Sequence, residues 1–85
     1  MEKYSIEIKK SAVKEIKSLP AQVLKKILAK IASLAENPRP PDSIKLSGEE
    51  KYRLRCGNYR VLYTIEDQVL VVYVVKVGHR KDVYR

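Results

Sequence analysis

Cysteine and histidine are almost absent from this sequence, with one of each among 85 residues. A single cysteine excludes an internal disulfide, and a single histidine leaves no Cys/His cluster with the spacing of a metal site. Cys56 falls on the apolar positions of an expected strand, which is typical of a small core residue rather than a nucleophile. We therefore expect no metal and no cofactor.

Long hydrophobic runs are absent too. No stretch is long enough to span a bilayer, and the first residues lack the apolar run of a signal peptide. We expect a cytoplasmic protein without membrane contact. With 45% hydrophobic and 33% charged residues, the composition indicates one soluble folded domain over residues 1–85.

Positive charge is what the sequence has in excess. The net charge is +8, which favours a polyanionic partner. Five of the six arginines lie in residues 51–85, whereas residues 1–50 are rich in lysine. Arginine is suited to planar, bidentate contacts with phosphate. A basic surface kept for solubility explains the lysines better than it explains the arginines.

The first half of the chain predicts a strand and two helices. Residues 4–9 alternate apolar and polar side chains, as a half-buried strand does. Ser11 has the character of a helix N-cap, and Pro20 suits the first turn of a second helix. Asn37-Pro38 should end that helix. Its apolar residues at helical spacing are Val23, Leu24, Ile27, Leu28, Ile31 and Leu34, and Lys25, Lys26 and Lys30 should point outward.

The second half predicts strands. Residues 44–46 form an extended piece, residues 51–63 a hairpin, and residues 69–77 a β-branched strand typical of burial on both faces. The fold class is therefore α+β, in the order β-α-α-β-β-β. Two N-terminal helices should pack on one face of a mainly antiparallel sheet, leaving the other face partly open.

The hairpin concentrates arginine. Closing it with a two-residue turn at Gly57-Asn58 places Arg55 directly opposite Arg60, with Arg53 on the same face. Like charges opposite one another destabilise a sheet, so this arrangement indicates a bound anion. Because a buried unpaired guanidinium is costly, we expect the arginines on the open face.

The following strand should extend this surface. A two-residue turn at Asp67-Gln68 would pair Arg60 with Val75, so that Val77 and His79 continue the Arg60 face. Arg53, Arg55, Arg60 and Arg80, with Lys51 and Lys81, could then line one groove. Tyr73 and Tyr84 could join it, whereas Tyr52 and Tyr63 should be core. A basic groove with aromatic rings suits single-stranded RNA.

These residues resemble the RelE toxins of the RelE/ParE superfamily. The similarity rests on the joint spacing of four segments and covers nearly the whole chain. They are Lys45-Leu46, Tyr52-Arg53-Leu54-Arg55 with Tyr59-Arg60-Val61-Leu62-Tyr63, Val74-Val75-Lys76-Val77-Gly78-His79-Arg80, and Val83-Tyr84. The resemblance implies a toxin that cuts messenger RNA in the ribosomal A site without a metal. It also implies a cognate antitoxin that covers the active surface.

The resemblance also implies roles for single residues. Arg60 and Arg80 match phosphate-stabilising arginines, Arg80 also being a candidate for protonating the leaving oxygen. Tyr84 matches a tyrosine that stacks on or orients the substrate. The basic residues expected to contact RNA or the ribosome are Lys45, Lys51 and Lys81. Arg53 and Arg55 stand where the best-known members carry lysines.

Arginine at positions 53 and 55 leaves the identity of the general base undecided, because arginine does not lose its proton in proteins. His79 is a candidate, since its unperturbed pKa suits proton transfer near neutrality; a histidine that only packs in a loop is the alternative. Two other functions also remain open. One is a ParE-like inhibitor of DNA gyrase, and the other is an RNA- or ribosome-binding domain that has lost catalysis.

Overall fold

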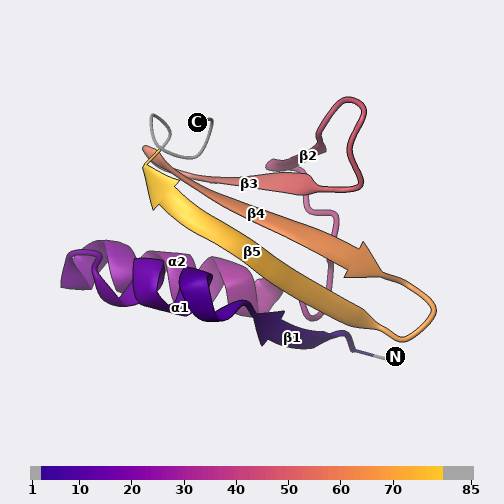
Figure 1. Ribbon diagram of the computed structural model, residues 1–85, viewed down its shortest axis with the longest axis horizontal. Helices are drawn as coiled ribbons and strands as arrows, with labels where there is room; N and C mark the ends of the chain where they lie inside the picture. Colours follow the sequence, from indigo (N-terminus) through magenta and orange to yellow (C-terminus); the bar gives the residue numbers. More distant parts are fainter. Residues whose placement is uncertain (1–2, 80–85) are drawn as a thin grey trace.

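The computed structural model describes residues 3–79, which form two helices and a five-stranded sheet (Figure 1). The elements are β1 (Ser5–Ile8), α1 (Lys10–Lys17), α2 (Ala21–Ser33), β2 (Ser43–Lys45), β3 (Tyr52–Cys56), β4 (Tyr59–Glu66) and β5 (Val71–His79). The strand order is β1-β5-β4-β3-β2, with only β1 and β5 parallel. The predicted fold class is confirmed, and the extended piece at residues 44–46 corresponds to β2.

The helix boundaries differ from the prediction. Lys9, not Ser11, precedes α1: its N–H donates to the Val74 carbonyl at 2.9 Å and its own carbonyl accepts from Val13. Lys9 thus makes both a hydrogen bond to the sheet and the first hydrogen bond of the helix. Pro20 is the N-cap of α2, one residue before the helix starts. The helix ends at Ser33, before Asn37-Pro38.

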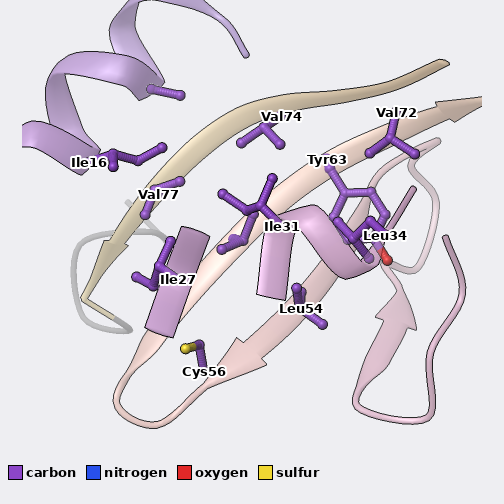
Figure 2. Close-up of a cluster of buried hydrophobic side chains, with 12 residues drawn as sticks. Ile16, Ile27, Ile31, Leu34, Leu54, Cys56, Tyr63, Val72, Val74 and Val77 are labelled. Atoms are coloured by element: carbon purple, nitrogen blue, oxygen red, sulfur yellow. The ribbon is translucent and has the colours of Figure 1, made fainter. Parts of the chain in front are cut away.

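The core lies between the helices and one face of the sheet (Figure 2). Ile27, Ile31 and Leu34 contribute the α2 side and are almost completely buried. Cys56 belongs to this core, as predicted. Leu28 does not: its exposed fraction is 44%, because it faces away from the sheet.

Tyr52 and Tyr63 face the core side, as their positions in the strands predict. Their rings stack with centroids 5.7 Å apart. Tyr63 is fully buried, and its hydroxyl donates to the Pro38 carbonyl at 2.7 Å. Burial raises the pKa of Tyr63. This bond ties the segment after α2 to the middle of the sheet.

The β4–β5 connection is longer than predicted. The strands are joined by residues 67–70, with Leu70 at φ 55°, and the ladder is irregular at Leu62/Tyr63. Arg60 therefore lies opposite Gly78, and the predicted pairing with Val75 is wrong. Val69 lies in the loop and is 68% exposed. Strand β5 is not buried on both faces either: its burial alternates, because the helices cover only one side.

A polar cluster fixes this loop. Asp67 accepts hydrogen bonds from two Arg39 nitrogens, at 3.2 and 2.8 Å, and from the Tyr4 hydroxyl at 2.6 Å. Arg39 also donates from Nε to the Tyr52 hydroxyl at 3.1 Å. The bonds from Arg39, and then that from Tyr4, lower the pKa of Asp67 to about 2. The loop is thus tied to Tyr4, directly before β1, and to the connector after α2.

The edge of β5 is closed by α1 where β1 stops. The last β1 pair is Ile8 with Val74, so no strand among the described residues pairs with Val77 on that side. Its N–H instead donates to the Glu15 carboxylate at 3.0 Å. No helix within residues 3–79 is long and apolar enough to cross a membrane.

Candidate nucleic-acid interface

The β3–β4 hairpin has the predicted register. Arg55 lies directly opposite Arg60, and Arg53 lies opposite Leu62. Gly57 opens the turn with φ 61°, which fits a type II′ turn that requires glycine at its first central position. The neighbours Leu54, Cys56 and Val61 on the alternate positions belong to the core, so the three arginines occupy the open face, as predicted.

The arginines share one hollow. It has a volume of about 430 Å³ and is lined by Pro41, Asp42, Ile44, Arg53, Arg55 and Arg60. Arg55 is exposed, Arg53 is partly buried, and Arg60 is only 7% exposed. The connector before β2 forms one wall, so the arginines form a concave surface and not a flat patch.

Arg60 is the one buried charged residue in the described part of the chain. Its Nη1 donates to the carbonyls of Gly57 and Tyr59, each at 3.0 Å. Its Nε is buried and has no hydrogen-bond partner among the described residues. A buried donor without a partner costs about 1–3 kcal/mol. Such a donor beside two more guanidinium groups is what an anion site offers its ligand.

Asp42, which lines the hollow, and Lys30, which holds Asp42 from α2, were not predicted to belong to the site. The Asp42 carbonyl accepts from the Arg55 N–H at 3.1 Å. Lys30 reaches from α2 to form an ion pair with the Asp42 carboxylate and donates to the Arg55 carbonyl at 3.3 Å. Lys30 therefore does not simply point into solvent. Its hydrogen bond lowers the pKa of Asp42, and its charge offsets a carboxylate that would otherwise weaken anion binding.

His79 is not on the arginine face. It lies opposite Tyr59, and the two rings meet edge to face with centroids 5.5 Å apart. With Glu15 and Leu19 it lines a separate hollow of about 310 Å³ on the helix side. The predicted continuity with Arg60 is wrong, because the irregularity at Leu62/Tyr63 shifts the pairing by one residue and so moves His79 to the other face.

The other predicted residues are spread over the sheet. Lys45 lies opposite Tyr52, away from the arginine face, with its Nζ 3.7 Å from the Glu50 carboxylate. Lys51 directly precedes β3 and is partly buried. Tyr73 is on the open face but at its far end, where it shares a hollow with Glu7 and Glu66. The remaining candidates, Arg80, Lys81 and Tyr84, lie outside the described residues.

Known proteins are similar to this chain in both fold and sequence. Residues 6–84 match the family described as the ParE toxin of the type II toxin-antitoxin system, parDE. The mRNA interferase toxin RelE of Escherichia coli K12 is 32% identical over 81 residues, 92% of this chain and 84% of the relative.

Solved structures agree. The archaeal RelE-RelB complex from Pyrococcus horikoshii OT3 has a TM-score of 0.83 and 33% identity, over 93% of this chain and 97% of that one. The toxin-antitoxin complex RelBE2 from Mycobacterium tuberculosis has a TM-score of 0.82 and 26% identity, over 92% and 99%.

The family match, the similar relative and the shared fold thus show a small basic toxin of the type II toxin-antitoxin class. Within that class, the chain belongs to the RelE/ParE toxin superfamily.

Proposed function

We propose that this toxin is an endoribonuclease that cuts messenger RNA in the ribosomal A site and so stops translation. The observation that carries the proposal is the hollow lined by Arg53, Arg55 and Arg60, where the buried Arg60 Nε has no partner within residues 3–79. The similarity to the mRNA interferase toxin RelE of Escherichia coli K12 supports the same activity.

The proposed reaction is an intramolecular transfer at phosphorus. The 2′-oxygen of a ribose forms a bond to the adjacent phosphorus, the bond to the 5′-oxygen breaks, and a 2′,3′-cyclic phosphate remains. Negative charge grows on the phosphoryl oxygens in the transition state, where Arg60, Arg53 and Arg55 would bind it. Arg80 would add a further positive charge or protonate the 5′-oxygen, and Tyr84 would stack on or orient the substrate. Such charge stabilisation can replace a metal, so the proposed reaction needs no metal ion bound by the toxin.

The acceptor of the 2′-hydroxyl proton is a separate question. Arg53 and Arg55 are unsuited to it, because their guanidinium groups stay protonated. An imidazole is chemically suited to act as a base, but His79 lies on the helix side of the sheet. We expect His79→Ala and His79→Gln to cut ribosome-bound messenger RNA at near-normal rates. A loss of more than a hundredfold in both would make His79 the base after all.

The decisive experiment maps messenger RNA ends after adding purified protein, with and without ribosomes. Removing one transition-state contact costs about a hundred- to a thousandfold in rate. We expect that loss for Arg60→Ala and Arg80→Ala, with unchanged circular dichroism. Lys17→Ala, at an exposed position of α1, is the matched control and should cut normally. Full toxicity of both arginine variants would count against the mechanism.

A ParE-like inhibitor of DNA gyrase is the second candidate, because the matching family is described by parDE. The two activities share a fold, so structure alone does not separate them. After expression in cells, incorporation of labelled amino acid should fall before incorporation of thymidine if RNA is the target. The opposite order would favour gyrase. RNA binding with steep salt dependence and no cleavage would instead indicate a domain without catalysis.

The proposed partners are the ribosome with its messenger RNA, and a cognate antitoxin. Solved structures with this fold include complexes of RelE with RelB. An acidic antitoxin would complement the net charge of +8. A gene beside that of the toxin should therefore encode a short acidic protein that binds it and restores translation.

A further inference from the structure

A second hollow lies on the helix side of the hairpin. It has a volume of about 530 Å³ and runs between α2 and the β3–β4 turn. Its walls include Val23, Lys26 and Ala29 from α2, and Cys56, Gly57 and Tyr59 from the hairpin. Figure 2 shows Cys56 close to this turn, on the same side of the sheet as Ile27. We call this hollow the turn groove.

The lining of the turn groove is apolar with a positive rim. None of its described lining residues is acidic. Lys26 is exposed there, and the ammonium of Lys30 is paired with Asp42. An apolar pocket with a cation at its rim fits an apolar side chain followed or preceded by a carboxylate.

The turn groove and the arginine hollow lie back to back across one layer of sheet. Cys56 pairs with Tyr59 on the helix side, whereas Arg55 pairs with Arg60 on the open side. The carbonyls of Gly57 and Tyr59 hold the Arg60 guanidinium, and the same two residues line the groove. A ligand in the groove would therefore touch the backbone that positions Arg60, from the face that RNA does not use.

We propose that the turn groove is a docking site for an acidic segment of the antitoxin, which inserts an apolar side chain there and sets a carboxylate against Lys26. The inference rests on the proposed antitoxin partner. It adds a contact surface behind the RNA face, so that the antitoxin grips the turn that holds Arg60 as well as covering the arginines. Binding here and anion binding in the arginine hollow would then be coupled reciprocally.

Two matched pairs of variants on α2 test this. Ala29→Glu places a charge and bulk inside the groove, and Ala32→Glu makes the same change at an exposed position that does not line it. Lys26→Glu reverses the charge at the rim, and Lys25→Glu reverses the adjacent charge outside it. All four changes keep good helix formers on exposed positions, so circular dichroism and thermal stability should be close to wild type.

The probe is the purified antitoxin encoded beside the toxin gene, titrated into each variant. We expect Ala29→Glu and Lys26→Glu to raise the dissociation constant at least tenfold, and the two controls to stay within twofold. Cleavage of ribosome-bound messenger RNA by the free variants should match wild type. Equal affinities for all five proteins would overturn the docking site. The docking site would also be overturned if Lys26→Glu bound the antitoxin as tightly as wild type and changed only the self-association of the toxin.

These readouts separate the docking site from the proposed function. If wild-type toxin cuts no RNA but the groove variants still lose antitoxin affinity, the nuclease proposal fails and the docking site stands. If the toxin cuts RNA and the affinities are all equal, the reverse holds.

Discussion

Replacing Arg60 by methionine should abolish activity without weakening the fold. The two side chains have similar volume, and the position is only 7% exposed. In a protein selected for stability alone, a buried guanidinium whose Nε has no partner in the described part of the chain would be a poor choice at this site. We expect Arg60→Met to cut RNA at least a hundredfold more slowly, since it removes a charge contact of the transition state.

The expected stability follows from opposing contributions. The variant loses two hydrogen bonds from Arg60 Nη1 to the carbonyls of Gly57 and Tyr59. It also removes a buried donor that lacks a partner, worth about 1–3 kcal/mol, and the desolvation of the charge. Replacing buried ionic groups by apolar ones of similar volume is often neutral or stabilising by about 1–4 kcal/mol. We therefore expect an unchanged or higher free energy of unfolding.

Thermal unfolding followed by circular dichroism measures this directly. For a domain of this size, 1 kcal/mol shifts the midpoint by about 4–8 °C. Leu54→Ala is the reference for a structural loss: Leu54 is 1% exposed, and such truncations cost about 2–5 kcal/mol. If Arg60→Met lowered the midpoint as far as Leu54→Ala does, Arg60 would be a structural residue and the reasoning would be wrong.

Three further predictions concern the frame around the site. The folded pKa of Asp67, about 2, lies below its ordinary 3.8, so its carboxylate stabilises the fold above about pH 4 and loses that effect as the pH falls toward 2. Urea unfolding of wild type and Asp67→Asn should therefore differ at pH 7 and converge near pH 2; a constant difference would contradict the assignment. Tyr63→Phe should lower the free energy of unfolding by about 1–3 kcal/mol, because it leaves the buried Pro38 carbonyl without its donor. A shift below about 2 °C in the thermal midpoint would argue against that bond. Gly57→Ala should lower the free energy of unfolding by about 1 kcal/mol or more, because φ is 61° at this position, although no atom blocks the added carbon. An unaltered thermal midpoint would show that the turn can change type.

The hairpin shows what could be predicted from local pattern. Gly57-Asn58 defines the turn, the turn defines which residues are opposite one another, and alternation defines the faces of Arg53, Arg55 and Arg60. Each step depends on neighbours within a few residues. The apolar spacing of α2 is equally local, and it correctly placed Ile27, Ile31 and Leu34 in the core.

The register of β5 shows what the local sequence pattern could not predict. Asp67-Gln68 resembles a short turn, but Arg39 and Tyr4 hold Asp67 from distant parts of the chain, and the loop takes four residues. The longer loop alone would move the partner of Arg60 from Val75 to Val77. The irregularity at Leu62/Tyr63 adds one more residue, which places Gly78 opposite Arg60 and His79 on the other face. The contacts that decide the loop come from two elements that the local sequence does not contain.

By itself, the sequence determined the order of helices and strands, the apolar faces and the gathering of arginines on one side of a hairpin, because these follow from spacing along the chain. Only the tertiary structure decided how deeply each arginine lies. The connector before β2 forms one wall of the hollow, and Lys30 holds its Asp42 in place. Arg60 lies buried there, with one donor that has no partner among residues 3–79. Burial and hydrogen bonding depend on atoms brought together from four elements, and no local pattern in a sequence specifies that meeting.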